Sequence, residues 1–359
     1  MKDIDLKLRG KIKAISPKLL ICLLLLSWGQ VLQAKGSDQG AEIKVGWNAK
    51  DLAVIVNDND PLSVQVAKYY QAKRGIPPKQ VVHVSFESGS KSIGEKEFNK
   101  IKQRVDAQTP ANVQGYVLTW SLPFKVNCMS ITTAFAAGYD KMFCARGCKE
   151  TRHNPYFDSA SSKPSDDFGW RPTMMLAAEN YEEAVKLIDR GVASDYSQPK
   201  GAAYLLKTKD KARNTRALFF PEVVEKFNGD FTVNYLENNF IEFKKNVMFY
   251  FTGAAHVQKI DHNTYLPGAV ADHLTSFGGD LSGHGQTSVL EWLQAGVTGS
   301  YGTVVEPCSF PQKFSSPSVL MEYYLKGNSL IEAYWKSVAE PGQGLFVGEP
   351  LAKPFAKRQ

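Results

Sequence analysis

Short apolar runs alternate along this chain with stretches whose apolar residues recur at helical spacing. Residues 52–56 are continuously apolar, which is typical of a strand buried in a parallel sheet. Asp60 and Pro61 then supply the capping side chain and first-turn proline of a helix. The pattern next predicts a strand at 81–84, a helix near 95–107 and a strand at 115–120. This β-α-β-α-β order predicts a doubly wound sheet.

The alternation stops between residues 121 and 171. This segment contains three cysteines, several glycines and prolines, and the polar run 159–163. Loops of this length are usually functional or held by their own cross-links. We therefore expect an N-terminal α/β half (45–120), an irregular cysteine-bearing insertion (121–171) and a second α/β half (172–355).

The alternation resumes after the insertion. Helices are predicted at 181–188, 214–227, 287–294, 319–325 and 330–338, and strands at 202–206, 231–233, 247–251, 268–271 and 302–305. The chain is predicted to be α/β throughout, with a mostly parallel sheet.

The strongest apolar run, residues 19–26, is too short to span a bilayer comfortably. A basic segment precedes it, and Leu32-Gln33-Ala34 follows it with a small residue at the end. This layout predicts a secretory signal peptide over residues 1–34, with an uncleaved anchor as the alternative. We expect an exported protein, in the periplasm, at the cell surface or outside the cell, with no stable membrane span after cleavage.

The net charge of the chain and its distribution argue against a nucleic-acid partner. The chain has 43 basic and 36 acidic side chains, a net charge of +7. Residues 1–34 contain six basic and two acidic side chains, a net +4, so the remainder carries +3. There is no basic stripe of the kind that nucleic-acid binding needs. With 43% hydrophobic residues, the composition also excludes a disordered protein.

Four cysteines remain after the signal segment, and an even number in an oxidising compartment predicts two disulfides. Cys144 and Cys148 flank a turn containing a glycine that could bring their sulfur atoms together, which would leave Cys128 and Cys308 as a long-range pair. Three connectivities are possible. The alternative is a zinc site in which His153 joins Cys144 and Cys148.

In open α/β sheets, ligands bind beyond the carboxyl ends of the strands. Asp58 and Asp60 follow the first strand and are candidate binding residues. With Asp166 or Asp167 they could also hold calcium, which prefers oxygen ligands. The alternative is that Asp60 caps a helix and Asp58 lies in a turn.

Further candidates follow the later strands. Gly278 and Gly279 would let backbone amides approach a ligand, with plain turns as the alternative. His273 lies within or beside a strand and is a candidate binding residue; the alternative is a partly buried histidine satisfied by a backbone partner. Glu306, at the end of a strand, is a candidate acid or base, with a turn contact as its alternative.

The order of the later segments resembles gingipain-type, caspase-like cysteine peptidases. The resemblance is carried by residues 116–120, 166–167, 171–172, 183–188 and 348–351. It implies a histidine after one strand and a cysteine after the next, within hydrogen-bond reach. This sequence has Ala254 and Ser276-Phe277 at those places. The remaining candidates are Ser276, or Cys308 paired with His256 or His273.

A closer resemblance is to an uncharacterised family of secreted bacterial proteins found with the exosortase protein-sorting system. The matching runs are 57–61, 118–123, 189–195, 271–276, 298–308, 332–338 and 341–344. The resemblance implies a cell-envelope or export context, without supplying a reaction.

Together these features predict an exported α/β protein on a degenerate caspase-like scaffold that binds a polypeptide or glycan during surface protein sorting. The alternative is a secreted cysteine hydrolase that uses Cys308 with His256 or His273. The sequence leaves open whether the protein is an enzyme, and it does not address the oligomeric state.

Overall fold

The structure is a computed structural model that describes residues 46–145, 147–283 and 285–358. The predicted signal peptide, residues 1–34, lies outside these residues. The described residues all belong to one compact unit. Within the described residues, no helix is long and apolar enough to cross a membrane.

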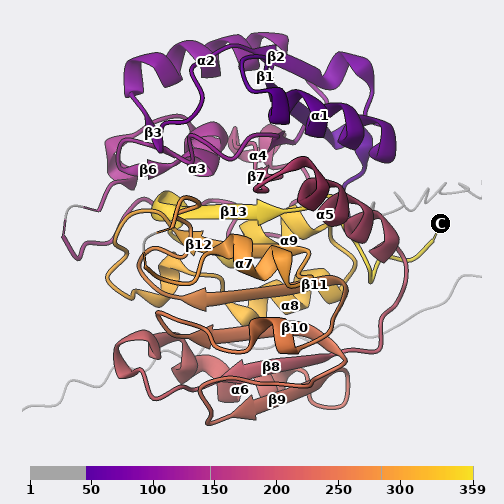
Figure 1. Cartoon of the computed structure of the whole chain (residues 1–359), viewed down its shortest axis with the longest axis vertical. Helices are drawn as coiled ribbons and strands as arrows, with labels where there is room; N and C mark the ends of the chain where they lie inside the picture. Colours follow the sequence, from indigo (N-terminus) through magenta and orange to yellow (C-terminus); the bar gives the residue numbers. More distant parts are fainter. Residues whose placement is uncertain (1–45, 146, 284, 359) are drawn as a thin grey trace, which may run out of the picture. The chain divides into compact units, whose positions relative to one another are not determined.

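A ten-stranded sheet forms the centre of this unit, in the order β2-β1-β4-β7-β13-β12-β11-β10-β8-β9 (Figure 1). In chain order its strands are β1 (Leu52–Asn57), β2 (Val81–Val84), β4 (Gly115–Leu118), β7 (Thr173–Met175), β8 (Ala202–Leu206), β9 (Thr232–Leu236), β10 (Val247–Gly253), β11 (Tyr265–Leu274), β12 (Gly299–Thr303) and β13 (Gly344–Gly348). All neighbours pair in parallel except β12 and β13. The sheet therefore has two parallel halves that run in opposite directions.

Helices cover both faces of the sheet. They are α1 (Pro61–Arg74), α2 (Glu95–Gln108), α3 (Ile131–Ala137), α4 (Pro164–Phe168), α5 (Tyr181–Ser194), α6 (Phe220–Lys226), α7 (Val289–Gln294), α8 (Pro317–Leu325) and α9 (Leu330–Ser337). In Figure 1, α5 and α7 lie in front of the sheet, and α8 and α9 lie behind it. The predicted α/β class with a mostly parallel sheet is confirmed.

The strands form where the apolar runs predicted them because both faces of the sheet are covered. Every residue of β1, β8 and β10 is buried, so these strands cannot alternate between apolar and polar positions. Asp60 caps α1 by accepting a hydrogen bond from the amide of Leu62, with Pro61 in the first turn, as the sequence predicts.

The prediction that residues 121–171 are irregular is wrong for part of this segment. A second sheet joins β3 (Ser92–Ile93), β5 (Lys125–Val126) and β6 (Met129–Ser130), and α3 follows directly. The Ser130 side chain caps α3, and Phe135 on this helix is buried against Phe98 and Trp120. Cys128 shortly before this helix, and Gly138 and Cys144 after it, hide its short apolar pattern. The insertion thus contributes a helix to the main core.

A buried ionic cluster fixes the end of the chain to the first half of the sheet. The Arg74 guanidinium donates to both carboxylate oxygens of Glu349, at 2.9 Å for Nε, and to Asp195 at 2.5 Å. The Tyr70 hydroxyl also donates to Glu349 at 2.9 Å. Burial raises the pKa of Asp195, and Arg74 partly offsets that shift. The cluster links α1, the end of α5 and the segment after β13.

Candidate functional site

The carboxyl ends of β10 and β11 lie side by side, as the resemblance to caspase-like peptidases implies. Gly253 pairs with Leu274, so the segments that begin at Ala254 and Thr275 leave the sheet as neighbours. Ala254 is buried, His256 is exposed, and Ser276 is half-buried. The structure shows no hydrogen bond between the side chains of His256 and Ser276. The strands are in the predicted places, but the side chains at their ends form no described catalytic pair.

His273 packs inside the protein. Its side chain is fully buried at the end of β11, and its Nδ1 accepts a hydrogen bond from the Trp292 indole at 3.0 Å. Burial lowers the pKa of His273 to about 3, with smaller contributions from Arg216 and other cations. The imidazole is therefore neutral, and it holds α7 against β11. The expectation that His273 binds a ligand is not supported by this position.

Gly278 and Gly279 are needed for close packing of the chain. A Cβ atom on Gly279 would lie 2.4 Å from the carbonyl oxygen of Gly302, and one on Gly278 would lie 3.1 Å from the His273 ring. The Gly279 amide also donates to the Thr303 carbonyl at 2.9 Å. These contacts place the loop after β11 directly on β12, so the amide of Gly279 is already used.

A buried ion pair that the sequence analysis missed lies next to His273. The Arg216 guanidinium is 2.5 Å from the carboxylate of Asp272, and the Ser315 hydroxyl donates to the same carboxylate. Burial raises the pKa of Asp272, and Arg216 opposes that shift. Arg216 also donates to the Thr252 carbonyl at 3.0 Å. This pair joins the carboxyl ends of β10 and β11, and the spacing of Arg216 within a predicted helix gave no signal for it.

Cys308 forms a disulfide with Cys148, which lies 160 residues earlier. Its sulfur is therefore not a thiolate, and the predicted Cys308 nucleophile is wrong for the disulfide-bonded protein. The Glu306 carboxylate accepts a hydrogen bond from the Cys308 amide at 2.7 Å. Glu306 thus makes the turn contact that was the alternative to an acid or base role.

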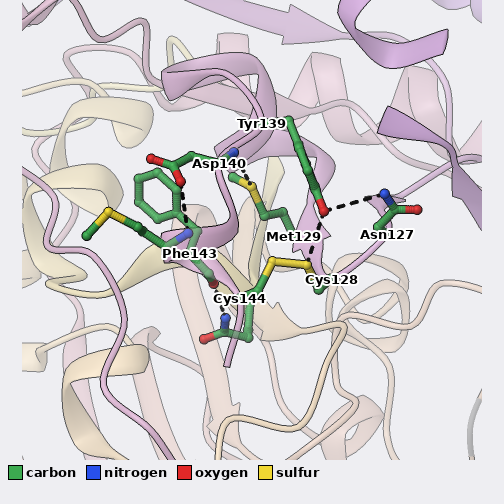
Figure 2. The surroundings of a disulfide bond; sticks show 9 residues. Asn127, Cys128, Met129, Tyr139, Asp140, Phe143 and Cys144 are labelled. Atoms are coloured by element: carbon green, nitrogen blue, oxygen red, sulfur yellow. Dashed lines mark hydrogen bonds between the residues drawn. A yellow bond between two sulfur atoms is a disulfide. The ribbon is translucent and has the colours of Figure 1, made fainter. Parts of the chain in front are cut away.

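The second disulfide joins Cys128 to Cys144 (Figure 2). The prediction of two disulfides is confirmed, but the expected pairing of Cys144 with Cys148 and of Cys128 with Cys308 is wrong. The turn at 141–143 is capped by Asp140 and directs Cys144 toward the β5–β6 turn, where Cys128 lies. Cys148 lies beyond this turn and reaches the loop after β12. The alternative zinc site is also wrong, because both of its cysteines are bonded elsewhere.

The aspartates proposed as a calcium site are dispersed. Asp58 contacts His83 Nδ1 at 2.6 Å, and Asp60 caps α1. Asp166 accepts a hydrogen bond from Gln114, which lies at the amino end of β4. Asp58 lies beyond the carboxyl end of the neighbouring β1, so at about 3.3 Å per strand residue Gln114 and Asp58 are about 20 Å apart. Asp167 accepts a hydrogen bond from Ser161. The described part of the chain contains no group of three or more histidine, cysteine or acidic residues placed to hold a metal ion.

The candidate site that the structure favours is a cleft where four loops meet. The loops follow β1, β2, β4 and β11, and the segment after β7 completes the wall. Adjacent strands are rotated by roughly 20°, so β11 and β1, five steps apart, differ by roughly 100°. The residues that line the cleft follow β1, β2, β4 and β7 in one half of the sheet and β11 in the other, although the two halves run in opposite directions.

We call this site the leucine cleft, and its volume is about 380 Å³. Its apolar lining is aliphatic, consisting of Leu62, Leu122, Ala178, Leu281 and Leu290. Its polar lining consists of Asp60, Ser88, Gly89, Ser121, Glu179 and Ser282. Asp60 is the one residue of this lining that the sequence analysis proposed as a binding residue.

Two sets of hydrogen bonds fix the walls of the leucine cleft. The Ser121 hydroxyl donates to the Ala178 carbonyl at 2.9 Å and accepts from the Ala178 amide at 3.1 Å. Asp280 accepts from the hydroxyl and amide of Ser282 and lies 3.3 Å from the Lys91 amine. Burial raises the pKa of Asp280, but the Ser282 hydrogen bonds and Lys91 outweigh this and lower it. The charged Asp280 therefore holds the loop that carries Leu281.

Glu179 differs from the other carboxylates in this region. It is exposed at the rim, and its carboxylate forms no hydrogen bond or ion pair with any described residue. By contrast, the carboxylates of Asp60 and Asp280 are both bonded within the protein. Glu179 and Ser121 were missed by the sequence analysis, although each follows a strand closely, which is the signal that could have identified them.

Comparisons with known proteins give little further guidance. No family model and no curated protein matches this chain. Among solved structures, the complex of the pro- and mature domains of RgpB from Porphyromonas gingivalis is similar, with 10% sequence identity and a TM-score of 0.41. The similarity covers 84% of this chain and 79% of that chain.

Proposed function

We propose that this chain is an exported protein of the cell envelope that binds a polypeptide in the leucine cleft during surface protein sorting. Binding is non-covalent. The proposal is supported most strongly by the unpaired Glu179 carboxylate beside a cleft lined by aliphatic side chains. The two disulfides fit an exported protein, because such bonds persist in oxidising compartments.

The chemistry of the cleft favours a polypeptide with an aliphatic side chain next to a cationic group. An aliphatic side chain that enters between Leu122, Leu281 and Leu290 removes apolar surface from water. A lysine or arginine of the ligand can then pair with Glu179 at the rim. No aromatic ring lines this cleft, so a sugar ring would find no flat apolar surface among the residues described.

The experiment uses a fluorescein-labelled hexapeptide in which a leucine is flanked by lysines. Fluorescence anisotropy is measured as the protein is titrated. Leu281→Asp should weaken binding by about 30-fold, because about 2 kcal/mol of side-chain burial is lost. Glu179→Gln should weaken it about threefold to tenfold, and this difference should shrink at high salt.

Matched controls lie outside the cleft. Leu218 is 81% exposed before α6, and Glu225 is exposed on the same helix. Leu218→Asp and Glu225→Gln should bind the peptide as the unchanged protein does. Equal losses in cleft and control variants, or no peptide binding at all, would refute the proposed function.

A further inference from the structure

A second cleft lies at the amino ends of β8, β9 and β10. Gly201 precedes β8, Thr232 begins β9 and Asn246 precedes β10, and all three line the cleft. Its volume is about 440 Å³, which falls within the range of about 300–1,000 Å³ typical of small-molecule sites. It shares no lining residue with the leucine cleft. We call it the phenylalanine cleft.

Two half-buried aromatic rings line this cleft, those of Phe231 and Phe355. Their centroids are 6.2 Å apart and their planes are inclined at 83°. Phe231 also contacts the buried Phe249 edge-to-face at 5.5 Å, and Phe355 contacts the buried Tyr324 at 5.8 Å. The core therefore fixes the orientation of both rings before any ligand arrives.

Polar side chains surround these rings and are available for bonding. The Asn246 Oδ1 accepts a hydrogen bond from the Tyr204 hydroxyl at 2.9 Å, which leaves its Nδ2 free to donate. The side chains of Lys200, Asp230 and Thr232 form no hydrogen bond or ion pair with any described residue. The cleft thus offers donors and acceptors together beside two half-buried aromatic rings.

We propose that the phenylalanine cleft binds a glycan, specifically a β-linked chain of hexopyranoses whose ring substituents are all equatorial. Such a ring presents flat faces of C–H groups, which pack on the electron-rich face of an aromatic side chain. Its hydroxyl groups both donate and accept, so they can bond to Asn246, Lys200 and Asp230. This site is independent of the polypeptide site proposed above.

Calorimetric titration of the full mature protein with cellotetraose and chitotetraose tests this assignment. We expect at least one of them to bind with a Kd of about 1 mM or lower. Phe231→Ala should weaken binding at least tenfold, and Asn246→Ala about threefold to tenfold. A β-linked galactose tetrasaccharide should bind at least tenfold more weakly, because its axial hydroxyl interrupts the C–H face.

Phe243 provides the matched control, because it is 72% exposed and lies outside the cleft. Phe243→Ala should leave glycan binding unchanged. If Phe231→Ala lowers the urea midpoint, Asn246→Ala and Asp230→Asn still test the site, because both residues are exposed. The proposal is overturned if neither tetrasaccharide binds at about 10 mM, or if binding is the same in Phe231→Ala, Asn246→Ala and the unchanged protein.

Discussion

Removing each disulfide in turn should reveal which cysteines are joined. Cys148→Ser/Cys308→Ser opens a loop with a sequence separation of 160, whereas Cys128→Ser/Cys144→Ser opens one of 16. Both bridges constrain the unfolded chain, and the longer loop constrains it more. The two double variants should therefore lose different amounts of stability.

The chain-entropy relation gives the size of this difference. It predicts a loss of about 5 kcal/mol for the loop of 160 and about 3 kcal/mol for the loop of 16. The loops do not overlap in sequence, so the two losses should add when all four cysteines are replaced. The excess of about 2 kcal/mol for Cys148→Ser/Cys308→Ser is the quantity to test.

Urea unfolding without reductant, followed by tryptophan fluorescence, measures the free energy of unfolding of each double variant. Both should remain folded in water at low temperature, because the buried core around the sheet consists of aliphatic and aromatic side chains. The reasoning is refuted if Cys148→Ser/Cys308→Ser costs no more than Cys128→Ser/Cys144→Ser. Peptide mapping of the oxidised protein that finds Cys144 joined to Cys148 would contradict the pairing itself.

Three further predictions concern buried charges. The pKa of His273 is about 3 in the folded protein and about 6.5 in the unfolded chain. Between pH 6.5 and pH 3 the unfolded chain therefore binds a proton that the folded protein does not. The free energy of unfolding should fall by about 1.4 kcal/mol for each pH unit as the pH drops through this range. The free energy of unfolding should depend less on pH in His273→Gln than in the unchanged protein, whereas His256→Gln, at an exposed position, should behave like the unchanged protein. The same pH dependence in His273→Gln and the unchanged protein would contradict this prediction. Glu349→Gln should lower the free energy of unfolding by about 3 kcal/mol, because Arg74 loses its buried charged partner, and a loss below about 1 kcal/mol would contradict it. Burial lowers the pKa of Lys336 to about 8, and its amine donates to the carbonyls of Ser159 and Ser161 in the insertion. Lys336→Met should therefore speed limited proteolysis of the insertion. An unchanged cleavage rate would show that Lys336 does not hold the insertion in place.

Most of the sheet could be predicted from the sequence because buried parallel strands read as unbroken apolar runs. The runs at 52–56, 202–206 and 247–251 became β1, β8 and β10. Two strands of this sheet were missed: β7, which is three residues long, and β13, in which three apolar residues stand between two glycines and show no periodic pattern. Strand β13 lies at the centre of the sheet and reverses its direction, so the two-halved topology could not be predicted without it.

The site was harder to predict because it depends on contacts between distant segments. Asp60 was identified because it follows a predicted strand. Glu179 follows β7, which the sequence analysis did not predict, and Leu281 reaches the same cleft from the other half of the sheet. The disulfide pairing was wrong for a similar reason, since cysteine connectivity cannot be deduced from spacing alone. Gly278 and Gly279 were predicted to contact a ligand, but in the structure they allow close packing of the chain. Glycine permits close approach of the backbone as readily as approach of a ligand, so the sequence does not distinguish the two.

The claim that the protein binds a polypeptide without cleaving it is tested most directly by methyl NMR. The protein is labelled at leucine methyl groups and titrated with the lysine-flanked leucine hexapeptide, whose own signals are followed in the same sample. We predict that the methyl signals of Leu62, Leu122, Leu281 and Leu290 shift together while the peptide stays intact. Shifts confined to leucines outside the leucine cleft, or new signals from a cleaved peptide, would contradict the account.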